Sequence, residues 1–251
     1  MKLGTHSSKV YDEQLRALHA KLLLLASLVE EMIGGGSAAY FGRDTDGARA
    51  TIRLDRRINR LACEVDALAM QILATRQPVA SDLRFLTVAL KVTVDLERMG
   101  DLCVNVCQRV IELNEETPLE PTIDLTSMVN KTAEAVRAAL HAFASNDAAQ
   151  AAATRRRDAT IDAEYDRVFY QILERMACDP GAVYRATRVQ SIAKYLERIA
   201  DHAALIAERV IFLEEGRDVR REEDEAPPSS LRSRRVSAAA GTDDASIGGI
   251  H

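Results

Sequence analysis

Apolar residues recur along this chain at alternating intervals of three and four positions. In the first such stretch they are Leu15, Leu18, Leu22, Leu25, Val29 and Met32. This period places the apolar side chains on one face of an α-helix, as in helices that pack side by side in a bundle. No strand pattern competes with it. Glycine and proline divide the chain into six predicted helices, over residues 9–33, 44–75, 80–114, 122–145, 147–177 and 182–215.

The chain also contains an internal repeat. Asp95–Cys103 in the third predicted helix matches Tyr195–Ala203 in the sixth, 100 residues later. A unit of three helices therefore occurs twice, and we expect the repeats to span residues 8–116 and 117–216. Residues 217–251 carry a mixed-charge run followed by Pro, Ser, Ala and Gly, and are predicted to be a disordered tail.

Composition narrows the class of protein further. Aromatic residues make up 4% of the 251 residues and tryptophan is absent, which argues against a β-sandwich and against a platform for stacking bases. A net charge of −5 gives no reason to expect nucleic acid as a partner. The amino terminus lacks the apolar core of a signal peptide, and the apolar runs are shorter than the ~20 residues of a membrane span. We expect a cytoplasmic protein without membrane insertion.

Acidic or amide side chains occur in pairs, four residues apart, on four of the predicted helices. The pairs are Asp55/Asn59, Glu97/Asp101, Asp158/Asp162 and Glu197/Asp201. This spacing puts both members of a pair on one helix face. The pairs in the repeated motif border the apolar stripe, where carboxylates need a counter-charge.

Two counter-charges fit these pairs. One is arginine, since Arg56, Arg57, Arg98, Arg155–Arg157 and Arg198 all lie close in sequence. The other is a metal ion, and oxygen donors suit magnesium, calcium, manganese or iron better than zinc. The sequence has no Glu-x-x-His, which argues against a ferritin-like di-iron centre.

Other candidate chemistry is sparse. The sequence contains no P-loop, G-x-S-x-G, H-E-x-x-H or Rossmann glycine pattern, so we expect a protein that is not an enzyme. The four cysteines, Cys63, Cys103, Cys107 and Cys178, lack zinc spacing and are expected to be small buried residues. Two alternatives to a regulatory role stay open: a metal-dependent phosphohydrolase that uses the carboxylates, and a purely structural helical bundle.

Two segments carry a family resemblance. The first runs from Gln77 to Arg84 and continues through Leu90–Asp101, and the second joins Tyr195–Ala203 to Ala207–Gly216. In this order, on a tandem repeat of helices, they resemble the two signatures of the PhoU family of phosphate-uptake regulators. The resemblance extends from about Val10 to Arg221.

The resemblance implies a fold and a role. The fold is two tandem, pseudo-symmetric three-helix bundles. The role is that of a regulatory adaptor of phosphate homeostasis, acting with the ATPase of a phosphate ABC transporter and with a phosphate-sensing histidine kinase. Such proteins negatively regulate high-affinity uptake and phosphate-starvation signalling when phosphate is plentiful. A homodimer is expected.

The resemblance also implies a metal site. Some members bind multinuclear iron or zinc clusters through a repeated Glu/Asp-x-x-x-Asp motif, which maps here onto Asp55, Glu97, Asp101, Asp158, Asp162, Glu197 and Asp201. Asn59 stands where the family usually has aspartate, and Leu205 replaces the asparagine that Asn105 keeps in the first unit. With four carboxylates against three, the second unit is predicted to bind metal more tightly.

Overall fold

The protein is described by a computed structural model that covers residues 9–78, 80–217 and 219. These residues form seven α-helices, one short 3-10 helix and no strand. The helices are α1 (Lys9–Gly42), α2 (Thr45–Thr75), α3 (Ala80–Asn114), α4 (Thr126–Ser145), α5 (Ala148–Arg155), α6 (Asp158–Cys178), η1 (Pro180–Ala182) and α7 (Val183–Glu215). The prediction of an all-α protein is confirmed, with the fifth predicted helix divided between α5 and α6.

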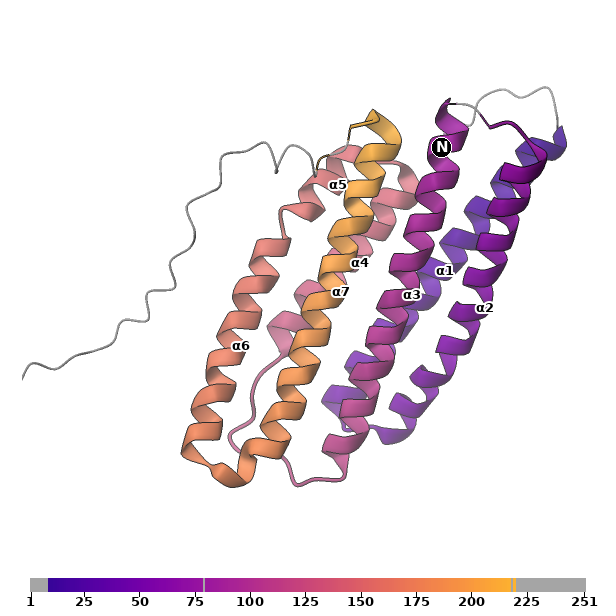
Figure 1. Ribbon diagram of the computed structural model, residues 1–251. Coiled ribbons are helices and arrows are strands. Elements are labelled where there is room, and N and C mark those ends of the chain that lie inside the picture. Colours follow the sequence, from indigo (N-terminus) through magenta and orange to yellow (C-terminus); the bar gives the residue numbers. More distant parts are fainter. Residues whose placement is uncertain (1–8, 79, 218, 220–251) are drawn as a thin grey trace, which may run out of the picture. The chain divides into compact units, whose positions relative to one another are not determined.

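The helices pack as two groups that meet along α3 and α7 (Figure 1). Helices α1, α2 and α3 pack against one another, and α4, α5 and α6 pack around α7. Helix α2 flanks α3 on one side, and α6 flanks α7 on the other. All of the described residues belong to one compact unit. The boundaries of the two repeats, 8–116 and 117–216, stay predictions.

The apolar stripes form the core that joins the two groups. Every member of the first stripe, from Leu15 to Met32, is fully buried. One continuous apolar cluster takes in residues of α1, α2 and α3 together with Ile199, Ile206 and Val210 of α7. At about 25 cal/mol per Å² of apolar surface removed from water, this shared core is the main force holding the two groups together.

Helix α1 continues nine residues beyond its predicted end at residue 33. Three consecutive glycines, Gly34–Gly36, suggested a break, because each costs helix stability. In the structure Gly36 is buried, and a Cβ built on Gly35 would lie 2.5 Å from Oγ1 of Thr51 in α2. The prediction was wrong here because close packing against the neighbouring helix outweighs the low helix propensity of glycine.

The division between α5 and α6 falls inside a run of three arginines. Helix α5 begins at the cap residue Asp147, whose carboxylate accepts a hydrogen bond from the amide of Gln150 at 2.9 Å. It ends at Arg155, and a turn at Arg156 and Arg157 precedes α6. The turn places Asp158 in the first turn of α6, where a helix dipole favours a negative charge.

The cysteine prediction holds for two of the four residues. Cys103 and Cys107 are buried in the core, whereas Cys63 and Cys178 are exposed. Burial raises the pKa of the Cys107 thiol to about 11, so this group is a packed apolar side chain. The exposed pair lies on the outer faces of α2 and α6, where sequence spacing alone did not separate them from core positions.

Among the described helices, α1 alone is long and apolar enough to cross a membrane by length and composition. Half of its most apolar stretch is buried inside the bundle, and α1 packs against α2 and α3. The core of the bundle therefore accounts for its apolar residues.

The structure describes only two of the first residues of the predicted disordered tail, 217–251. Arg217 donates a hydrogen bond to Glu215, and the side chain of Val219 is buried in the core. Residues 218 and 220–251, where most of the predicted disordered tail falls, lie outside the described residues.

Candidate functional site

The carboxylates of the second unit gather where α6 meets α7. Asp158 and Asp162 lie one turn apart on α6, and Asp201 faces them from α7. One carboxylate oxygen from each of the three lies within 4.8 Å of the others. The spacing of four residues predicted that Asp158 and Asp162 share one face of their helix, and the packing of α7 against α6 adds Asp201. It is the single group of three or more His, Cys, Asp or Glu side chains found this close among the described residues.

Burial and crowding perturb these acids. Burial, followed by the charges of Asp162 and Asp201, raises the pKa of Asp158 from 3.8 to about 6. Burial also raises the pKa of Asp201, with Glu197 and Asp162 adding to the effect. Each shift means that the charged form is disfavoured, and a nearby cation would relieve it.

Glu197, the fourth predicted ligand of the second unit, already has a cation beside it. The Lys194 ammonium donates to both carboxylate oxygens of Glu197, at 2.8 and 2.7 Å. This lysine also lies over the ring of Tyr165, with its Nζ 5.1 Å from the ring centre. Glu197 therefore stands at the edge of the cluster, one turn from Asp201 and held by a lysine.

The first unit is more open. Asp55 on α2 accepts a hydrogen bond at 2.9 Å from Nδ2 of Asn59, the residue that stands in place of the expected aspartate. The other oxygen of Asp55, Oδ1, is buried and has no hydrogen-bond partner in the described part of the chain. Burial, and then the charge of Asp101, raises the pKa of Asp55. Burial likewise raises the pKa of Glu97. Three acids thus lie near one another without the close convergence seen in the second unit.

Two acids near these clusters were not predicted. Asp66 lies three turns beyond Asp55 on α2, and its charge helps raise the pKa of Glu97. Glu208 lies two turns beyond Asp201 on α7 and adds to the shift of Asp158. Both follow a predicted ligand at a spacing, eleven or seven residues, that keeps them on the same helix face. Both acids could have been predicted from that spacing.

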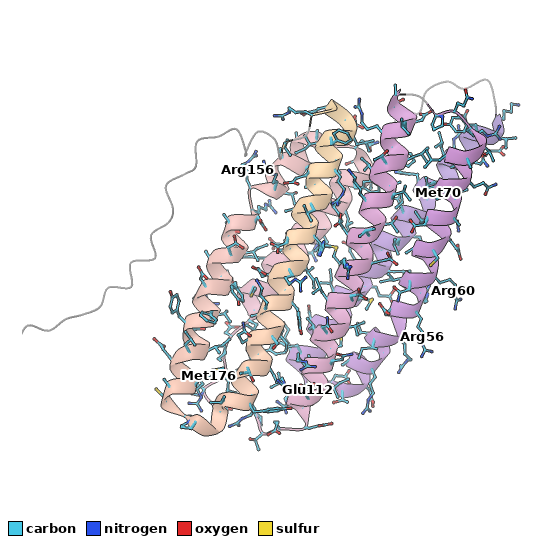
Figure 2. All side chains as sticks on the ribbon, viewed as in Figure 1. Arg56, Arg60, Met70, Glu112, Arg156 and Met176 are labelled. Atoms are coloured by element: carbon cyan, nitrogen blue, oxygen red, sulfur yellow. The ribbon has the colours of Figure 1, made fainter. Side chains whose placement is uncertain are left out.

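Arginine does not pair with every one of these carboxylates in the described part of the chain, as the structural alternative requires, since the hydrogen-bond partner of Asp55 there is Asn59. Arg56 is exposed and points away from the bundle (Figure 2), and Arg57 is exposed as well. Nη1 of Arg98 is 4.0 Å from Asp101, with both side chains more than half exposed. Arg155 pairs with Glu208 at 3.2 Å. An exposed pair such as Arg98–Asp101 contributes little to stability.

A hollow of about 310 Å³ lies where the two repeats meet. Its polar lining comes from Asp55, Arg98, Asp101, Asn105, Arg198 and His202. Arg98 and Arg198 occupy equivalent positions of the repeated motif, so the pseudo-symmetry brings both to one place. Gly100, on the same helix as Arg98, packs against Ile58, since a Cβ built there would lie 3.3 Å from Ile58 Cδ1. The small residue of the motif thus lets α2 approach α3.

Beneath this hollow, a buried acid connects α3 to α7. Asp95 is almost completely buried, and its carboxylate pairs with the guanidinium of Arg209. His202 Nδ1 lies 3.1 Å from the other carboxylate oxygen. A buried charge needs such partners, because leaving it unpaired in the core is very costly. This contact was not predicted from the sequence. The residue equivalent to Asp95 in the second repeat is Tyr195, so the acid is not part of the repeated pattern.

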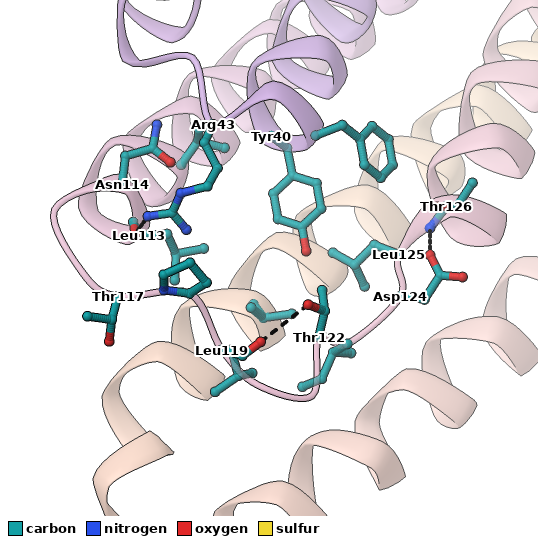
Figure 3. A pocket seen from close by; sticks show the side chains of 15 residues that line it. Tyr40, Arg43, Leu113, Asn114, Thr117, Leu119, Thr122, Asp124, Leu125 and Thr126 are labelled. Carbon is teal, nitrogen blue, oxygen red and sulfur yellow. Dashed lines mark hydrogen bonds between the residues drawn. The ribbon is translucent and has the colours of Figure 1, made fainter.

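A second cavity, of about 520 Å³, lies under the segment that connects α3 to α4 (Figure 3). Tyr40 points into it, and burial, with a smaller contribution from Asp124, raises the pKa of the Tyr40 phenol to about 12. Arg43, directly after α1, donates to the carbonyl oxygens of Leu113 and Glu116, and so ties the end of α3 and the start of the segment to the end of α1. Most of the remaining lining is apolar.

Fold and site together define an all-helical tandem-repeat protein with a cluster of carboxylates in each repeat. Two segments of the chain, residues 22–110 and 125–210, match the PhoU domain. The chain belongs to the PhoU family.

Similar proteins and structures extend the match along most of the chain. A "Phosphate-specific transport system accessory protein PhoU homolog" from Pseudomonas putida is 35% identical over 220 residues, which are 87% of this chain and 86% of that protein. A protein of the same name from Caulobacter vibrioides is 33% identical over 82% of this chain and 90% of its own length. The crystal structure of PhoU from Pseudomonas aeruginosa superposes with a TM-score of 0.80 at 34% identity, covering 82% of this chain and 100% of that one. The phosphate transport system regulatory protein PhoU from Streptococcus pneumoniae gives a TM-score of 0.76 at 29% identity, covering 83% and 98%.

Proposed function

We propose that this protein is a regulatory adaptor of phosphate homeostasis. It lowers high-affinity phosphate uptake and phosphate-starvation signalling when phosphate is plentiful. The observation that carries the proposal is the pair of PhoU domain matches, one in each half of the helical repeat. The names of the relatives, accessory proteins of a phosphate-specific transport system, support the same role.

The proposal includes partners and a location. A regulator of this kind binds the ATPase subunit of the phosphate transporter and the phosphate-sensing histidine kinase. It works in the cytoplasm, where both partners expose their soluble domains, and it works as a homodimer. It acts by binding and not by catalysis, in agreement with the lack of a nucleophile motif in the sequence.

The carboxylate clusters suit a metal in the proposed regulator. Their donors are oxygens of a hard-ligand set, three of them converge from α6 and α7, and the buried Oδ1 of Asp55 lacks a hydrogen-bond partner among the described residues. We propose that Asp158, Asp162 and Asp201 hold the tighter site, with Glu197 at its edge. Asp55, Glu97 and Asp101 would form the weaker one. Bound metal would supply positive charge that ties α6 to α7 and α2 to α3.

The regulatory role is tested by measuring phosphate uptake after deletion of the gene. In phosphate-rich medium the deletion strain should take up labelled phosphate several-fold faster than the parent strain. A plasmid copy of the gene should restore the parental rate. Equal uptake in all three strains would contradict the proposal.

The proposal of a non-enzymatic protein has its own test. Purified protein should leave generic phosphoesters unchanged in the presence of manganese or magnesium. Hydrolysis that disappears in Asp201→Ala and persists in Glu134→Gln, a change at an exposed position of α4, would instead support a metal-dependent phosphohydrolase.

A further inference from the structure

Five arginines follow one face of α2, on the side opposite its buried residues. They are Arg49, Arg53, Arg56, Arg57 and Arg60. At about 100° per residue, these positions fall within an arc of about 100° and extend ~17 Å along the helix. All five side chains are exposed, and Arg56 and Arg60 point away from the bundle in Figure 2. We refer to these five residues as the arginine face.

The arginine face has few counter-charges of its own. Arg53, Arg56 and Arg57 make no hydrogen bond or ion pair with any described residue, and Arg49 is 3.5 Å from an almost fully exposed Asp46. Arg60 acts on Glu64 only through its field, because the Glu64 carboxylate binds Lys21. Between positions 49 and 60 the one acidic residue is Asp55, which lies about 100° or more around the helix from the arginines. Asp46 and Glu64 lie on the arginine face only at its two ends.

Arginines on the other helices are mostly engaged. Arg109 and Arg188 share Glu112, at 2.9 and 2.5 Å, and Arg167 donates to Glu164 at 2.8 Å. A solvated helix face usually mixes the two signs of charge in this way. The arginine face does not.

This arrangement costs α2 stability. Arg53 lies three residues before Arg56 and four before Arg57, and Arg60 follows these two at the same spacings. Like charges at such positions repel across the helix surface. A row of carboxylates on a partner molecule would replace this repulsion between arginines by favourable contacts.

The composition of the face indicates which kind of acidic partner it suits. All five residues are arginine, whose planar guanidinium binds a carboxylate with two parallel hydrogen bonds. The exposed large apolar side chains nearest in sequence are Phe41 and Met70, outside the arginine face, whereas helices that bind membrane surfaces carry apolar anchors next to their basic residues.

We propose that the arginine face of α2 is a docking surface for an acidic helix of a partner protein. The partner helix presents carboxylates at intervals of three and four residues, matching the spacing of the arginines. The inference rests on the proposed regulatory function for the partner's place among the phosphate-responsive components. The docking chemistry itself is argued from α2 alone.

The test uses the full chain and two synthetic helical peptides. One peptide carries glutamates at i, i+4, i+7 and i+11, and the other has the same composition with its glutamates spread around the helix. The variant Arg53→Gln/Arg56→Gln removes two charges from the arginine face. The matched control Arg16→Gln/Arg137→Gln removes two exposed charges from α1 and α4.

The patterned peptide should bind the wild type and the control with equal affinity, and the α2 variant about tenfold more weakly. At low ionic strength the α2 variant should also melt at a higher temperature than the wild type, because a repulsion has been removed. Equal affinity for the two peptides, or unchanged affinity of the α2 variant, would overturn the proposal.

Vesicles of phosphatidylcholine and phosphatidylglycerol test the alternative that the arginine face binds a membrane surface. Binding to these vesicles that is lost in Arg53→Gln/Arg56→Gln, without any preference for the patterned peptide, would assign the face to a membrane surface and overturn the proposal. None of these results depends on phosphate uptake. A failed docking test and a failed regulatory test are therefore separate outcomes.

Discussion

At the scale of single residues, Asp158 shows how the second cluster behaves without a cation. Its carboxylate is half-buried at the start of α6, and the charges of Asp162, Asp201, Glu197 and Glu208 all act on it. The helix dipole favours its charge, but burial and these neighbours outweigh that effect and raise its pKa to about 6. The cluster therefore holds negative charge that the folded protein disfavours.

This raised pKa predicts a pH dependence of stability in metal-free protein. Because Asp158 binds a proton more tightly in the folded state, its cost is fully present above about pH 6 and is relieved as the pH falls toward 3.8. With chelator present, Asp158→Asn should melt at a higher temperature than the wild type at pH 7, and the difference should shrink as the pH is lowered to about 5. A constant difference across this range, or no difference at all, would show that the pKa of Asp158 is not raised.

A bound metal ion should cancel the destabilising repulsion among the acids of the second unit. Adding manganese or iron to the wild type should raise the melting temperature, since a ligand that binds only the folded state stabilises it. Asp201→Asn should lose most of this response, and Glu134→Gln should keep it. Metal analysis of the purified protein provides the independent reading. If no metal copurifies and Asp201→Asn responds to added metal as the wild type does, the clusters are not metal sites.

The candidate ligands could be predicted from the sequence because a spacing of four residues fixes a common helix face. The convergence of Asp158, Asp162 and Asp201 follows from that rule and from the pairing of adjacent helices. The contact of Asp95 with His202 and Arg209 could not be predicted in this way. It depends on how α3 and α7 are placed side by side, which no local spacing encodes.

At the scale of the helices, periodicity identified the buried faces better than glycine identified the ends. Leu15, Leu18, Leu22 and Leu25 are all fully buried, as their spacing predicts. The three glycines after Ile33 do not end α1, because Gly35 and Gly36 allow the close approach of α2 and α3. The break at Arg156 carries no glycine or proline, so the sequence offered no signal for it.

The glycines of α1 give a prediction with an internal control. Gly34→Ala should stabilise the protein by up to ~1 kcal/mol, because the added methyl group meets no atom within 4 Å and alanine favours the helix. Gly35→Ala should instead destabilise it by about 1–3 kcal/mol, since its Cβ would lie 2.5 Å from Oγ1 of Thr51. Urea unfolding of both variants measures this difference. Equal stabilisation by the two substitutions would show that α1 and α2 are less closely packed at Gly35 than the structure indicates.

The interface between α3 and α7 gives a second prediction at this scale. Asp95→Asn should destabilise the protein by about 3 kcal/mol, because Arg209 loses its buried counter-charge. Glu134→Gln, at an exposed site, should change stability by less than ~0.5 kcal/mol.

An apolar pair should compensate. Asp95→Leu/Arg209→Met should recover much of the lost stability, because apolar side chains can replace a buried ion pair at little cost. Denaturant unfolding of the three variants measures the contact. A negligible effect of Asp95→Asn would show that it contributes little to the interface.

At the scale of the whole molecule, the two repeats form one structural unit. The resemblance implied two pseudo-symmetric bundles, and the helices do pack in two groups. The apolar cluster that includes Ile199 and Ile206 of α7 also includes the leucines of α1, so the groups share a core. The repeat in the sequence predicts similar halves. The extent of the core that they share depends on contacts between residues about 100 positions apart. The pattern of a single sequence does not reveal such contacts.

This joined molecule is the proposed regulator, and expression of a phosphate-starvation gene tests that claim most directly. A reporter for such a gene should be silent in phosphate-rich medium in the parent strain and strongly active in a strain that lacks this protein. Supplying the wild-type gene should silence it again, and deleting the phosphate-sensing kinase as well should abolish the activity. A reporter that stays silent in the strain lacking the protein would contradict the proposed function.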